Sequence, residues 1–336
     1  MSSLGRVLAG AAVLGVAGAA GALAMYWVLR PAAPVASGAF AAGAPLGVTH
    51  EEGFTPVSAG VRVFGAVVNA ESCVHDAERD LIVVLNRGAP QHQAVNDGFA
   101  SLLNPDGSVH TPRWIGATRD GLVLNHPFGS EIAGGVLHVA DVDGGTGRFD
   151  PQVAVLRRFD MATGAPVGEV RVEGATWLND VAVAPDGSVY ATQTGDRGDG
   201  PDRWRVWRIS PAGEVSVFLQ GAPLDRPNGV ALTEAGEIVV VNSGDDAVLT
   251  FSPDGALIAT ERAAQAGGDG IAIMPDGTKY VSSVGHGGVS RIRPGEPAEL
   301  IAEGIPAAAS LCLDPVRGQL VIPMNENSAL AFVPLD

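Results

Sequence analysis

The sequence contains few positively charged residues. Its 336 residues include 21 Lys and Arg against 37 Asp and Glu, which gives a net charge of −16 at pH 7. Proteins that bind nucleic acid neutralise phosphates with clusters of Lys and Arg, and a chain this acidic lacks that supply. We therefore expect no nucleic-acid partner, and we ascribe the excess of acidic side chains to solubility.

Several sequence motifs are also missing. The chain has no P-loop, no Gly-rich dinucleotide fingerprint after a strand and no Cys-x-x-Cys pair. Long helical patterns are absent after residue 30, whereas 45 Gly and 23 Pro supply turn residues. These features exclude common nucleotide-binding folds and favour an all-β domain.

A short motif recurs along the chain, and each copy consists of an apolar strand, a polar turn and a second apolar strand. Four copies cover residues 71–84, 179–192, 228–241 and 269–282. The position just before the first strand of each copy holds an oxygen-bearing side chain. These residues are Glu71, Asn179, Asn228 and Asp269.

Two further copies place Phe128 and Ala309 at the same position. The six copies are about 40 to 57 residues apart, which leaves room for four short strands each and is typical of propeller blades. The sequence therefore predicts a six-bladed β-propeller over residues 57–336. The last blade lacks a fourth strand, and we expect the β-rich run 61–68 to supply it and close the ring.

The four polar residues of the repeat predict a metal site. Blades around an axis would direct these side chains at a common centre, and carboxylate and amide oxygens are the ligands that calcium prefers. Four protein ligands would leave coordination positions open for water or substrate. A structural explanation also exists, because Asn and Asp are common at strand entries, where they satisfy loop backbone groups.

The same segments resemble a known family. ESCVHD (71–76), LND (178–180), RPNGVAL (226–232) and GGDGIAI (267–273) are similar to the senescence-marker-protein/gluconolactonase (regucalcin-like) family, and more distantly to paraoxonases and strictosidine synthase-like proteins. The resemblance covers about residues 65 to 336. It implies a divalent metal, usually calcium, on Glu71, Asn228 and Asp269, with Asn179 at the metal or beside the substrate. It further implies hydrolysis of lactones, with Asp269 as the base.

This chain departs from the relatives at some positions. Paraoxonases have a catalytic His at the position where this chain has Phe128, and they have an acidic residue where it has Ser72. His126, two residues before Phe128, could reach the same mouth of the channel and is a second catalytic candidate. A structural loop histidine is the alternative.

The N-terminus predicts a membrane segment. Residues 7–29 carry no charge and lie between Arg6 and Arg30, and about 20 apolar residues suffice to span a bilayer. A cleaved signal peptide is the alternative, since Ala22-Leu23-Ala24 offers a small-residue cleavage site. We assign 1–30 to this anchor or signal and 31–56, rich in Ala, Pro and Gly, to a linker. Either reading predicts an exported, periplasmic or extracytoplasmic propeller.

The two cysteines, Cys73 and Cys312, fall on the innermost strands of the first and last blades, which become neighbours when the ring closes. A disulfide there would suit an oxidising compartment. Their different offsets from the repeat position leave two buried thiols as the alternative.

The sequence as a whole predicts an exported, calcium-dependent hydrolase of small lactones or related esters. Asp269, or a hydroxide on the cation, would activate the attacking water. Two rivals remain: a membrane-tethered binding propeller in which the metal only rigidifies the channel, and a strictosidine synthase-like enzyme that needs no calcium.

Overall fold

The computed structural model describes residues 44–51, 53–89, 94, 96–116, 123–144, 151–196 and 198–335. The membrane segment expected at 7–29 and the first part of the expected linker lie outside these residues. Within the described ranges, no helix is long and apolar enough to cross a bilayer.

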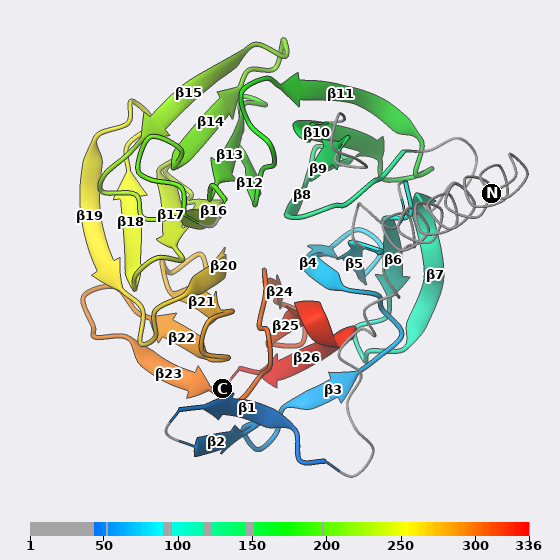
Figure 1. The fold of residues 1–336 in the computed structure, drawn as a ribbon. Coiled ribbons are helices and arrows are strands. Elements are labelled where there is room, and N and C mark those ends of the chain that lie inside the picture. Colours follow the sequence, from blue (N-terminus) through cyan, green and yellow to red (C-terminus); the bar gives the residue numbers. More distant parts are fainter. Residues whose placement is uncertain are drawn as a thin grey trace, which may run out of the picture. The chain divides into compact units, whose positions relative to one another are not determined.

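The described residues form six four-stranded antiparallel sheets around a central axis, as expected for a six-bladed propeller (Figure 1). In each of the first five blades the strands follow chain order from the axis outwards (Figure 1). Blade one comprises β4 (Ala70–Asp76), β5 (Leu81–Asn86), β6 (Phe99–Leu103) and β7 (Val109–Gly116). Blade two comprises β8 (Ser130–Ala133), β9 (Val136–Asp143), β10 (Val153–Asp160) and β11 (Pro166–Val172). Blade three comprises β12 (Val181–Val183), β13 (Val189–Gln193), β14 (Arg205–Ile209) and β15 (Val215–Gln220).

The remaining blades follow the same plan. Blade four comprises β16 (Pro227–Leu232), β17 (Ile238–Asn242), β18 (Ala247–Phe251) and β19 (Leu257–Arg262). Blade five comprises β20 (Gly268–Ile273), β21 (Lys279–Ser283), β22 (Val289–Ile292) and β23 (Glu299–Ala302). Blade six comprises β24 (Cys312–Asp314), β25 (Gln319–Met324) and β26 (Ala329–Pro334), with the short 3₁₀ helix η2 (Asn325–Asn327) between the last two.

The ring is closed by the N-terminal strand, as the sequence predicts. β3 (Arg62–Phe64) pairs antiparallel with β26, the third strand of blade six. Pairing the two ends of the propeller removes a free sheet edge. The apolar faces of neighbouring blades pack into buried clusters, and one such cluster joins Cys73 and Val84 of blade one to Phe332 of blade six.

The cysteines form the disulfide that the sequence left open. Cys73 and Cys312 are bridged, with their Cα atoms 5.4 Å apart. The innermost strands of blades one and six run side by side here, through a parallel bridge between Ser72 and Ser310. The disulfide therefore joins the two ends of the ring beside the central channel.

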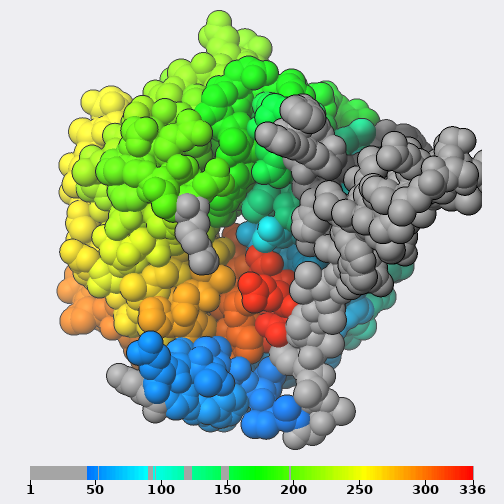
Figure 2. Space-filling model, viewed as in Figure 1, coloured from blue at the N-terminus to red at the C-terminus, as the bar shows by residue number. Residues whose placement is uncertain are grey.

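The end of the segment predicted as a linker is a hairpin instead. β1 (Gly47–His50) pairs with β2 (Gly53–Pro56), and Figure 2 shows this hairpin as a blue surface beside blades five and six. Leu46 and Val57, at its two ends, pack against the core of those blades. The hairpin forms because Val48, Thr49 and Phe54 are good strand residues, which the Ala, Pro and Gly around them obscured.

Candidate functional site

The innermost strands are irregular where the polar residues of the repeat occur. The pairing of β4 with β5 skips Glu71, that of β16 with β17 skips Asn228, and that of β20 with β21 skips Asp269. A bulge leaves a residue unpaired and re-aims its side chain. Three blades therefore use the same local irregularity to turn a polar side chain away from the ladder and into the channel.

Glycines follow two of these residues because the strands approach closely. A Cβ on Gly229 would lie 2.4 Å from the carbonyl oxygen of Asp269, and one on Gly270 would lie 2.4 Å from the backbone nitrogen of Leu311. Only glycine allows the innermost strands to come this near. The Asn-Gly and Asp-Gly pairs of the sequence thus bring adjacent blades together at the axis.

The four predicted ligands are brought together in a buried ring. Glu71, Asn179, Asn228 and Asp269 are only 4%, 6%, 5% and 5% exposed. Asn228 donates through Nδ2 to Oδ2 of Asp269, at 3.2 Å. Asn179 donates through Nδ2 to Oγ1 of Thr194, at 3.1 Å. Its amide oxygen therefore points away from Thr194.

Two oxygens of this ring lack a partner. Oδ1 of Asn228 and Oδ1 of Asp269 are buried without a hydrogen bond among the described residues. An unpaired buried acceptor is costly, and native structures contain few of them. A bound cation would satisfy both, so the residues present fit the calcium that the sequence predicts. Because the described residues contain no cluster of three or more His, Cys, Asp and Glu suited to a metal, amide oxygens would have to complete the set.

The carboxyl groups of the centre repel one another. Burial raises the pKa of Asp269 well above its usual value, and the charges of Glu71 and Asp180 add to the rise. Burial likewise raises the pKa of Asp180 to about 7, with Glu71 contributing. Like charges in a water-poor channel favour the protonated forms, and a cation would reverse that preference.

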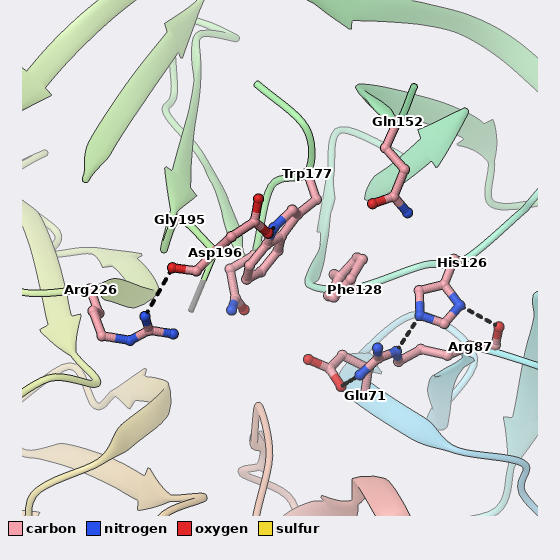
Figure 3. A pocket seen from close by; sticks show the side chains of 10 residues that line it. Glu71, Arg87, His126, Phe128, Gln152, Trp177, Gly195, Asp196 and Arg226 are labelled. Carbon is pink, nitrogen blue, oxygen red and sulfur yellow. Dashed lines mark hydrogen bonds and ion pairs between the residues drawn. The ribbon is translucent and has the colours of Figure 1, made fainter. Parts of the chain in front are cut away.

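Two of the four predicted ligands, Glu71 and Asn179, also line a pocket of about 350 Å³. Figure 3 shows the side chains around this pocket. Phe128 and Trp177 form an aromatic wall, with ring centroids 5.2 Å apart and planes inclined by 26°. Arg226 and Asp196 lie at the side opposite Glu71, where Arg226 donates to the backbone oxygen of Asp196 at 3.4 Å.

His126 lines the pocket, but both of its ring nitrogens are engaged. Nε2 accepts from Nε of Arg87 at 2.8 Å, and Nδ1 donates to the backbone oxygen of the same arginine at 3.1 Å. Burial and the positive charge of Arg87 lower the pKa of His126 to about 3. The ring is therefore neutral, and in this arrangement it positions Arg87. Its catalytic role stays a prediction.

Three residues at or beside the pocket were not predicted from the sequence as functional. Arg87 contacts Glu71, Asn325 donates to Glu71 from the start of η2, and Trp177 completes the aromatic wall. Arg87 and Asn325 follow the second strands of their blades, at the same end as the repeat positions. A search for polar residues after each second strand would have found both.

These features define a class of protein: a six-bladed propeller whose candidate site lies in its central channel. Its innermost strands are bulged, Asn-Gly and Asp-Gly pairs lie at the axis, and the centre is acidic. The chain belongs to the SMP-30/gluconolactonase/LRE-like family, whose model matches residues 153–322. This confirms the resemblance drawn from the sequence.

Solved structures agree on the fold. A gluconolactonase from Xanthomonas campestris is 19% identical, with a TM-score of 0.56 over 92% of this chain and 99% of that one. A virginiamycin B lyase from Staphylococcus aureus is 11% identical, with a TM-score of 0.54 over 82% of this chain and 99% of the other. Among curated proteins, none matches the chain.

Proposed function

We propose that this protein is a divalent-metal-dependent hydrolase of lactones or related esters. Membership of the gluconolactonase-like family supports lactone hydrolysis as the class of reaction. The observation that carries the metal is the pair of buried oxygens without partners, on Asn228 and Asp269, within a ring that includes Glu71 and Asn179. Calcium is the ion that this oxygen set suits best.

The reaction adds water to the carbonyl carbon of the lactone and breaks the ring C–O bond, which yields a hydroxy acid. A divalent ion on Glu71, Asn228 and Asp269, with Asn179 at or beside it, would polarise the carbonyl and stabilise the charge that develops on its oxygen. Asp269, once ionised, is the carboxylate that would take the proton of the attacking water.

The pocket explains how a small ring would be held. Phe128 and Trp177 offer a flat apolar surface against which one face of a lactone ring can pack. Arg226 and Gln152 supply hydrogen-bond donors on the remaining sides. A volume of about 350 Å³ is at the small end of ligand sites, and it suits a monocyclic substrate better than a polymer.

We further propose that the propeller works outside the cytoplasm, held at the membrane by residues 7–29. The uncharged segment supports this location. The Cys73–Cys312 disulfide supports it independently, because such bonds persist in oxidising compartments.

The experiment that tests the activity uses the purified full-length protein. It is stripped of metal with a chelator, dialysed and assayed by pH-stat on aliphatic lactones, sugar lactones and an aryl ester, with and without added calcium. We expect stripping to lower the rate at least about 100-fold and calcium to restore it. An active protein whose rate is unchanged by chelation would contradict the proposed metal dependence.

A further inference from the structure

The pocket contains a cation that directly contacts one of the proposed metal ligands. Arg87 lies just after β5, and its Nη1 donates to Oε2 of Glu71 at 3.2 Å (Figure 3). Its Nε donates to His126, and its guanidinium carbon lies 4.8 Å from the centroid of the Phe128 ring. Nη1 also donates to Oδ1 of Asn325 at 3.4 Å, so four neighbours hold the guanidinium beside Glu71.

Arg87 is the counter-charge of that centre. Burial raises the pKa of Glu71, and the adjacent guanidinium opposes the rise. The same guanidinium lowers the pKa of Asp269, although less than burial and the neighbouring carboxylates raise it. Arg226, the other arginine that lines the pocket, contacts a backbone oxygen of Asp196 instead.

The contacts of Glu71 set a condition for metal binding. Oε2 of Glu71 accepts from both Arg87 and Nδ2 of Asn325. An oxygen with two donors in place has little lone-pair capacity left for a metal. A divalent ion near a guanidinium also meets direct repulsion, which is strong in a poorly solvated channel.

We propose that Arg87 is a built-in counter-cation, which competes with the divalent ion for Glu71 and moves aside when the ion binds. The proposal rests on the metal site of the proposed function. The Arg87 side chain is 26% exposed and borders the pocket, so its guanidinium can withdraw toward solvent without unfolding a blade. Its departure would also release Nε2 of His126, the nitrogen that accepts from it. Metal binding would then expose this nitrogen to the pocket.

The test measures calcium affinity by titration calorimetry on the metal-stripped full-length protein. We expect Arg87→Gln to lower the Kd for calcium about tenfold or more, because repulsion and competition are both removed. The metal-free variant should also melt a few degrees below wild type, since Glu71 loses its partner, and calcium should restore its melting temperature.

Arg226→Gln is the matched control. It removes an equal charge from the same pocket without touching Glu71, and we expect its Kd to stay within about twofold of wild type. Arg87→Lys keeps the charge and should stay closer to wild type than Arg87→Gln does.

The outcomes separate this proposal from the proposed function. If Arg87→Gln binds calcium as tightly as wild type, or more weakly, the counter-cation is wrong while the metal site stands. If neither protein binds calcium or another divalent ion, the metal site itself is wrong and the counter-cation falls with it. An equal gain in Arg226→Gln would show a general effect of pocket charge and would also overturn the proposal.

Discussion

Two buried charge clusters of this propeller differ in how far their charges are balanced. Inside blade two, Arg157 is only 4% exposed and pairs with Asp141, Asp143 and Glu169. Asp141 also accepts hydrogen bonds from the backbone nitrogens of Asn125 and His126. The cluster is closed, because each carboxylate faces the guanidinium and no atom of Asp141 or Arg157 is among the buried atoms without a partner.

The channel centre is the opposite case. Three buried carboxyl groups lie there, those of Glu71, Asp180 and Asp269. Burial raises the pKa of each, and the charges of the other two add to the rise for Asp269. Arg87 opposes the rise for Glu71 and Asp269. Among the residues that the structure describes, two oxygens there have no hydrogen-bond partner. The comparison teaches that burial alone does not mark a functional site. The charges of the blade-two cluster are paired, whereas the centre is unbalanced, and we therefore propose that it binds a cation.

Asp269→Asn should produce the largest effect. The amide keeps the size of the side chain but removes a charged ligand and the proposed base. We expect hydrolysis to fall at least about 1,000-fold, or about 4 kcal/mol of transition-state stabilisation. Stability without metal should not fall, because a carboxyl group that repels Glu71 and Asp180 is removed. Steady-state kinetics and urea unfolding of the metal-stripped protein measure the two quantities.

Asp196→Asn is the control for charge at the pocket mouth. It keeps an oxygen that can accept from Nε1 of Trp177, as the carboxylate now does at 3.1 Å, and it should retain most of the activity. A lower free energy of unfolding for metal-stripped Asp269→Asn would mean that the charges of the centre are compensated, as they are in the blade-two cluster. The proposed difference between the two clusters would then be wrong.

Asp141→Asn should have the opposite effect on stability. Three donors surround this carboxylate, namely Nε of Arg157 at 2.6 Å and the backbone nitrogens of Asn125 and His126. An amide NH₂ would face one of these donors, and Arg157 would lose its most buried partner. We expect a loss of about 3 kcal/mol in the free energy of unfolding. Urea unfolding measures this loss. The exposed ion pair between Asp246 and Arg262 is the control, because Asp246→Asn should lower the free energy of unfolding by less than about 1 kcal/mol.

Most of the fold could be predicted from the sequence because a propeller repeats its signals. Each blade contributes the same strand-turn-strand pattern, so an error in one copy is corrected by the others. Closure by residues 62–64 followed from the missing fourth strand of the last blade. The β1–β2 hairpin was missed because it occurs once, and its stability comes from packing on blades five and six, which a local pattern does not reveal.

The site was predictable in part for the same reason. Glu71, Asn179, Asn228 and Asp269 share one position of the repeat, and all four are buried in the structure. Their role as metal ligands stays a prediction. Arg87 and Asn325 each follow the second strand of a blade, beyond the residues of the repeated motif, so the motif itself did not single them out. His126 was predicted to reach the channel mouth, and it lines the pocket, but its bonds to Arg87 depend on a loop geometry that the sequence does not encode locally.

The smallest expected effect concerns Glu131, which lines a second pocket together with Asp180. Burial raises the pKa of Glu131 from 4.5 to about 7, with Asp180 contributing. A carboxyl group with a raised pKa keeps its proton to a higher pH in the folded state than in the unfolded state. The contribution of Glu131 to the free energy of unfolding is therefore complete below about pH 4.5 and is lost as the pH rises through about 7.

We expect Glu131→Gln to remove about 2 kcal/mol of the decrease in the free energy of unfolding between about pH 5 and 8. The remaining loss belongs to other buried carboxyl groups with a raised pKa, among them Asp180, at about 7, and Asp269. Urea unfolding at both pH values measures it, and the exposed Glu173→Gln should keep the wild-type profile. If Glu131→Gln also keeps that profile, the charge of Glu131 is compensated in the folded protein. The uncompensated charge would then be confined to the ring of proposed metal ligands.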